Sequence, residues 1–317
     1  MRFIKIKTVF LQIFSILFLI SLTFTSFCSA NNQNPVIVDI NGNGDFTSVQ
    51  KAIDNSSQNT TIIINQGIYK ENIIINKTVK IIGENKNFSI ISGNESMYAF
   101  LLRASKINIT NLTIKNSRIG IYVNDKNYSE NNFSNNLIID NFEAIRLYGS
   151  SRNFILNNII KDNNDFGLVL YESSENKINN NLFFNNSKAI VTGRWSNNNI
   201  INANNITDNN QGLFLSYSFH NIVKRNTISK SDISVYMTYS SHNNLTNNTI
   251  KKSKLYGFYL SDSDENIIEP NNLTDNSVDI KYESRPPVVN TPGFELYFLI
   301  IALAFIIFFK KIHSSPL

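Results

Sequence analysis

The chain has 317 residues, of which 42% are hydrophobic and 17% are charged, and its formal net charge is +5. The positive excess lies at the two ends, where Glu295 alone opposes Arg2, Lys5, Lys7, Lys310 and Lys311. Between them, 24 Lys and Arg face 23 Asp and Glu. This balance excludes the basic surface of a nucleic-acid-binding protein, so we expect no nucleic-acid partner.

Residues 1–30 have the pattern of an export signal. Three basic residues precede an apolar stretch from Val9 to Phe27, and Cys28, Ser29 and Ala30 then supply the small residues of a signal-peptidase site. One alternative is an uncleaved signal anchor, because the stretch is long enough to span a bilayer. A lipoprotein that begins at Cys28 is disfavoured by the bulky Phe27. Cleavage after Ala30 would leave no cysteine for disulfides or thiolate metal sites.

Residues 31–115 are expected to form an N-terminal cap and the first coils of a solenoid. Asp39, Asn41, Asn43 and Gly44 partly match a calcium loop, but Gln50 stands where that loop needs a bidentate Glu. A capping turn is therefore expected and no cofactor, with calcium as the weaker alternative. The segments 39–46, 49–53 and 67–71 resemble the first coils of pectinesterases and pectate-lyase-like β-helices.

A unit of 22 to 24 residues recurs from residue 120 onward. Within it, a small residue is followed by apolar residues, a Ser six places on, and Asn nine and fourteen places on. Its three short alternating apolar segments indicate strands rather than helices. Stacked units form a solenoid of about eleven coils. The small residues that open the units are Gly120, Ala144, Gly167, Ala189, Gly212, Ser234 and Gly257.

The recurring Asn residues are expected to form two structural ladders, with side-chain amides hydrogen-bonded from coil to coil. The first column is predicted to contain Asn153, Asn176, Asn198, Asn221, Asn243 and Asn266. The second is predicted to contain Asn158, Asn181, Asn204, Asn226, Asn248 and Asn271.

Over residues 116–282 the unit resembles the NosD-like repeats, in which Gly-Ile-x-Leu-x-x-Ser-x-x-Asn-x-Ile-x-x-Asn-x-Ile recurs. This resemblance implies an all-β, right-handed, single-stranded parallel β-helix of the pectin-lyase-like type. It does not imply an activity, because such folds host unrelated functions.

The C-terminal segment is predicted to be a linker, 283–291, followed by a membrane anchor, 292–317. Pro292, Gly293 and Phe294 precede an apolar run that ends in two lysines. This order resembles the archaeal PGF-CTERM sorting signal, which implies processing by an archaeosortase and attachment to a lipid. The alternative is an ordinary single-pass anchor. Both predict an exported protein held at its C-terminus on the extracellular face of the membrane, and Asn-x-Ser/Thr sequons such as the one at Asn205 allow glycosylation there.

Catalysis would need facing acidic and basic side chains on one strand face. Arg146, Glu172 and Arg194 lie at outward positions in three successive units and form the best such cluster. They lack a second carboxylate, so solvated charges are the expected interpretation. A divergent polysaccharide lyase, esterase or hydrolase remains the alternative.

Aromatic residues recur at outward positions of the first strand and the turn after it. They predict a face that binds glycans, such as a polysaccharide or a surface glycoprotein, or envelope proteins. The alternatives are that aromatic residues only favour strands, or that the protein is a structural spacer. The predicted ligand-binding residues are Tyr122, Tyr148, Tyr171, Trp195, Phe214, Tyr236 and Tyr259.

His220 and His242 lie one unit apart and are expected to be close in space. Two imidazoles without Cys, Met or a third His make a poor site for copper, which the NosD name suggests. No metal site is therefore expected.

Overall fold

The computed structural model describes residues 34–284. The expectations for the export signal, for the linker from residue 285 onward and for the C-terminal anchor lie outside the described residues. Within residues 34–284 no helix is long and apolar enough to cross a membrane.

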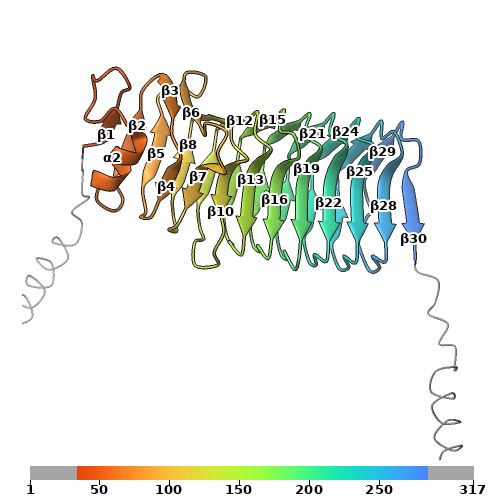
Figure 1. Cartoon of the computed structure of the whole chain (residues 1–317). Coiled ribbons are helices and arrows are strands. Elements are labelled where there is room, and N and C mark those ends of the chain that lie inside the picture. The colour runs from red at the N-terminus through yellow and green to blue at the C-terminus, as the bar shows by residue number, and fades with distance from the viewer. Residues whose placement is uncertain (1–33, 285–317) are drawn as a thin grey trace, which may run out of the picture.

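The chain winds into three parallel ten-stranded sheets, so the predicted all-β parallel β-helix is confirmed (Figure 1). Sheet A contains β1 (Val36–Val38), β2 (Thr61–Ile64), β5 (Lys80–Gly83), β8 (Asn108–Thr110), β11 (Asn132–Ser134), β14 (Phe154–Leu156), β17 (Lys177–Asn179), β20 (Ile200–Asn202), β23 (Ile222–Lys224) and β26 (Asn244–Thr246).

Sheet B contains β3 (Gly67–Lys70), β6 (Ser89–Ser92), β9 (Thr113–Lys115), β12 (Leu137–Ile139), β15 (Ile159–Lys161), β18 (Leu182–Phe184), β21 (Asn205–Thr207), β24 (Thr227–Ser229), β27 (Thr249–Lys251) and β29 (Asn272–Thr274). Sheet C contains β4 (Ile73–Ile75), β7 (Tyr98–Leu102), β10 (Ile119–Val123), β13 (Glu143–Tyr148), β16 (Phe166–Tyr171), β19 (Lys188–Gly193), β22 (Gln211–Ser216), β25 (Ile233–Thr238), β28 (Tyr256–Ser261) and β30 (Ile280–Glu283).

One end of the solenoid carries the short helix α2 (Val49–Asn55), which lies beside β1 and β2 (Figure 1). Ser48 caps the helix, and the Glu71 carboxylate accepts hydrogen bonds from the Val49 and Gln50 amides. A carboxylate is favourable there because the first amides of a helix lack acceptors of their own. The helix covers the apolar core, with its Val49 and Ile53 side chains buried.

The small residue that opens each repeat points its Cβ position into the core. A Cβ added to Gly167 would lie 2.6 Å from the carbonyl oxygen of Ala189 and 2.9 Å from the Phe183 ring. The following residues alternate, so that Leu168 and Leu170 are buried in the core. The size limit at the opening position therefore comes from packing against sheet B and the next coil.

The Asn ladders are present, and they bind backbone as well as side-chain groups. The Asn181 Oδ1 accepts from both the backbone amide and the Nδ2 of Asn158, at 2.9 and 3.0 Å. The same pattern links Asn181 to Asn204 one coil further on. All six members predicted for this second column are confirmed, and Asn136 extends it.

In the first column the prediction of Asn198 is wrong, because Asn199 occupies the ladder and bonds to Asn221. Asn198 lies beside it in a turn, at φ 56°. The shift has a local cause, since Arg194 and Trp195 both adopt left-handed backbone angles and Trp195 is an additional residue in that turn. A third ladder, not anticipated from the sequence, contains Asn141, Asn163, Asn186 and Asn209.

Near the N-terminal cap, the side chain of Asp39 closes a turn. Its Oδ1 accepts from the Asn41 amide at 2.8 Å, and its Oδ2 accepts from the Asn65 Nδ2 at 3.2 Å. These hydrogen bonds hold the pKa of Asp39 below its usual value. The carboxylate thus has the role expected of a capping turn.

Candidate ligand-binding face

Tyrosines gather on sheet C. Sheets A and B have ten strands each, as sheet C has, so strand propensity alone does not explain this distribution. Ten of the twelve described tyrosines lie on sheet C strands or directly after them: Tyr98, Tyr122, Tyr148, Tyr171, Tyr217, Tyr236, Tyr239, Tyr256, Tyr259 and Tyr282.

The predicted outward column of sheet C is in register. Phe214, Tyr236 and Tyr259 pair in successive strands, with ring centroids 5.0 and 4.9 Å apart. Their ring faces are therefore turned toward one another along the solenoid, and a ligand would meet ring edges and hydroxyls. In the preceding coils the column holds Val169 and Val191, which are buried.

The turn after sheet C, together with the strand ends that enter it, carries a row of aromatic side chains. Trp195 is 64% exposed, and Tyr217 and Tyr239 stack with centroids 4.8 Å apart. Tyr148 lies near the start of this row and is exposed. Tyr171 has the Arg194 guanidinium 5.9 Å from its ring centroid. The row therefore offers exposed aromatic surface and a cation to a ligand.

No ion pair within residues 34–284 joins Arg146, Glu172 and Arg194 to one another. The Arg146 guanidinium bonds to the Glu143 Oε1 at 2.5 Å, on the sheet C surface. Glu172 instead lies in the following turn, 3.5 Å from the Tyr148 hydroxyl.

A second charged group, which sequence reasoning missed, surrounds Arg146. Burial raises the pKa of the Glu143 carboxyl, and Arg146 acts in the opposite direction. Burial also raises the pKa of Asp165, opposed by Lys188 and Arg146. The Glu143 Oε2 and the Arg146 Nε are buried without a hydrogen-bond partner. Glu143 and Asp165 lie just before the small residue of their units, outside the outward positions that the repeat pattern suggested.

A groove follows the turns that connect sheet B to sheet C. It consists of three hollows with volumes of 480, 390 and 260 Å³. The first and second share Asn164, and the second and third share Ser187 and Asn210. Because these residues come from successive coils, the groove runs along the solenoid.

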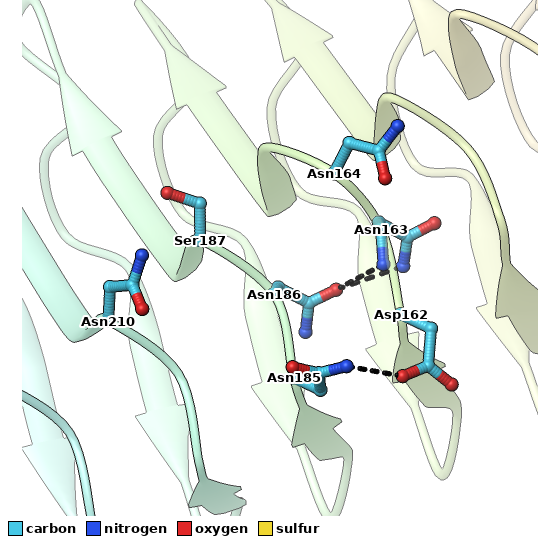
Figure 2. A pocket seen from close by; sticks show the side chains of 7 residues that line it. All are labelled: Asp162, Asn163, Asn164, Asn185, Asn186, Ser187 and Asn210. Atoms are coloured by element: carbon cyan, nitrogen blue, oxygen red, sulfur yellow. Dashed lines mark hydrogen bonds between the residues drawn. The ribbon is translucent and has the colours of Figure 1, made fainter.

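Amides line the middle hollow (Figure 2). The Asn186 Oδ1 accepts from the amide and Nδ2 of Asn163, and the Asn185 Nδ2 donates to Asp162 at 2.7 Å. Asn164 and Asn210 each follow a member of the third ladder and line the same hollow. The groove thus repeats polar donors and acceptors once per coil, which suits a polymeric ligand with a repeating unit.

Comparison with protein families gives a match to the model described as periplasmic copper-binding protein (NosD), over residues 53–218 and 191–286. The chain belongs to the NosD family. Among curated proteins, this NosD-family chain matches probable pectinesterase 67 of Arabidopsis thaliana with 44% identity over 69 residues. That match spans only 20% of this chain and 18% of the pectinesterase.

Two solved structures share the fold with this NosD-family chain. The A-module of mannuronan C-5 epimerase AlgE6 from Azotobacter vinelandii aligns with a TM-score of 0.56 and 12% identity, over 75% of this chain and 94% of the module. The tailspike protein 2 of an Escherichia coli O157:H7 bacteriophage aligns with a TM-score of 0.60 and 12% identity, over 81% of this chain and 42% of the tailspike. At this identity the likeness shows the fold alone.

Copper, which the family description names, does not fit the histidines as they are arranged. The His220 and His242 rings stack with centroids 5.4 Å apart and planes 6° apart. A ring nitrogen binds a metal in the plane of its ring, so one ion cannot lie in both planes. The His242 Nε2 lies 3.0 Å from Glu265, and among residues 34–284 no group of three His, Cys, Asp or Glu side chains is placed to hold a metal.

Proposed function

We propose that this NosD-family protein is an exported β-helix that binds polysaccharide along sheet C and the adjoining groove. The groove carries this proposal, because it crosses successive coils and asparagine side chains line each of its three hollows. A polymer that lies along the solenoid would meet amide donors and acceptors in each coil.

The aromatic row beside sheet C supports the same ligand class. Trp195 and Tyr217 expose ring surface that can pack on the apolar face of a sugar, and the stacked tyrosines present hydroxyls.

The protein is also proposed to be exported and held at the outer face of the cell membrane. The signal-like residues 1–30 and the family's periplasmic description support export, and residues 292–317 would anchor the protein at its C-terminus.

A glycan array probed with the purified protein tests this function. We expect binding to extended polysaccharides, weakened about fivefold or more by Trp195→Ala and by Tyr236→Ala. Phe88→Ala is the matched control, because Phe88 is an exposed aromatic residue in the turn between β5 of sheet A and β6 of sheet B, away from sheet C and the groove. Equal loss in all three variants, or no loss in any, would contradict a role for this face.

A second candidate function is catalysis, favoured by the charged group around Arg146. Two carboxyl groups of raised pKa beside a guanidinium provide the parts of an acid–base site. Incubation with uronate polymers, followed by detection of unsaturated sugar ends, tests it. Cleavage should be lost in Asp165→Asn and in Arg146→Gln, and full cleavage by both variants would dismiss these residues.

A further inference from the structure

The first hollow of the groove differs from the other two in having an aromatic side chain in its lining, and it combines this ring with two carboxylates and a guanidinium. Its volume is 480 Å³, and its lining includes Phe142, which is 41% exposed. The Arg118 guanidinium lies 5.6 Å from the centre of the Phe142 ring. This contact holds the cation at the sheet C side of the hollow.

The opposite side of the hollow is acidic. Glu95, Asn116 and Asp140 each follow a sheet B strand, with φ of 59°, 57° and 56°. Backbone hydrogen bonds align them in successive coils, from the Glu95 amide to the Asn116 carbonyl and from the Asn116 amide to the Asp140 carbonyl. Two carboxylates and an amide therefore face a guanidinium across the hollow.

These charges do not neutralise one another in direct contacts. None of the ion pairs within residues 34–284 involves Arg118, Glu95 or Asp140. The hollow keeps the cation and the carboxylates apart. A ligand that fits must bring an anionic acceptor to the Arg118 side and hydrogen-bond donors to the Asp140 side.

We propose that this hollow is a subsite for a uronic-acid residue, which rests on the polysaccharide-binding function proposed above and specifies its ligand. In a pyranose uronate the carboxylate on C5 and the hydroxyls on C2 and C3 lie on opposite sides of the ring. The carboxylate pairs with Arg118, the hydroxyls donate to Asp140 and Glu95, and the ring packs on Phe142. A neutral hexose leaves Arg118 without an anion, and an amino sugar in this orientation brings no anion to it.

Isothermal titration calorimetry of the purified protein tests the subsite. The probes are oligomers of polygalacturonate and of polymannuronate, each paired with its methyl ester, which keeps the backbone and removes the charge. We expect at least one acid form to bind about tenfold more tightly than its ester. Arg118→Gln should abolish that difference, while Arg118→Lys should keep part of it because the charge remains without the planar fork.

Two further variants separate a local role from a general effect of charge. Asp140→Asn should weaken the acid and the ester alike, because the hydroxyl contacts are common to both. Arg152→Gln is the control for lost positive charge, since Arg152 is exposed and pairs with Glu130 on the other side of sheet C. It should leave both affinities unchanged.

The outcomes separate the two proposals. Equal binding of acid and ester would overturn the uronate subsite and leave polysaccharide binding in place. An acid preference that survives Arg118→Gln would also overturn it, because the carboxylate would then bind elsewhere. Binding of neutral glycans alone would reject the subsite only, and failure of every glycan on the array would reject both.

Discussion

Replacing Asn181 with Ala is expected to destabilise the protein by about 2–5 kcal/mol. Asn181 is buried, and its Oδ1 accepts from the amide and Nδ2 of Asn158. Its Nδ2 donates to the carbonyl of Ile155 at 2.8 Å and to the Asn204 Oδ1 at 3.0 Å. The Ala variant leaves two buried donors of Asn158 without an acceptor, and each costs about 1–3 kcal/mol.

Urea unfolding followed by circular dichroism measures this loss, provided that the slope with urea concentration stays constant. Asn205→Ala is the control, because Asn205 is exposed on β21 and its side chain makes no hydrogen bond in the structure. It should cost less than about 0.5 kcal/mol. Similar small losses in both variants would refute the claim that the ladder, rather than asparagine content, stabilises the coils.

Three other predictions concern pH, packing and metal. Burial raises the pKa of Glu143 in the folded state above its ordinary value of 4.5, so the folded protein binds the carboxyl proton more tightly than the unfolded chain does. The free energy of unfolding therefore falls as the pH rises from the unfolded-state pKa through the folded-state pKa. The stability of Glu143→Gln relative to wild type should therefore improve from pH 4 to pH 7 in parallel denaturation series, and a constant difference would contradict the shift. Gly167→Ala should cost about 1–3 kcal/mol in urea unfolding, because its Cβ would lie 2.6 Å from a carbonyl oxygen; a stabilised variant would show that the backbone adapts freely. EDTA should leave the melting temperature unchanged, since no three ligand side chains converge within residues 34–284, and a fall of several degrees would reveal a structural metal.

The fold could be predicted because one pattern recurs in every coil from residue 120 onward. The spacing of small, apolar and Asn positions located the strands, and the second ladder was correct at every position. The first ladder failed at Asn198 because the sequence does not show where an additional residue is accommodated, and several neighbouring asparagines fit the pattern equally well. Only the backbone angles at Arg194 and Trp195 place it in the turn.

The candidate site was less predictable for a different reason. The alternation of side chains along a strand shows which of them point outward, so the aromatic column of sheet C could be predicted. The groove and the pairing of Arg146 with Glu143 depend on turn geometry and on which rotamer reaches a neighbour, and the repeat pattern does not encode either. Ring orientation was also beyond the sequence, although it decides whether a sugar meets the face or the edge of Tyr236.

The three ladders restrict where this chain can change in length. Their members are five residues apart through sheets A and B, as in Asn153, Asn158 and Asn163 or in Asn199, Asn204 and Asn209. One added residue between them would take an amide of that coil out of line with its neighbours in the ladder. In the coils that carry the ladders, additional residues therefore occur at the two borders of sheet C, and Asn164 and Leu255, which lie there, line the groove. Relatives should thus diverge in length along these two borders, where new ligand specificities can arise while the stacked scaffold stays unchanged.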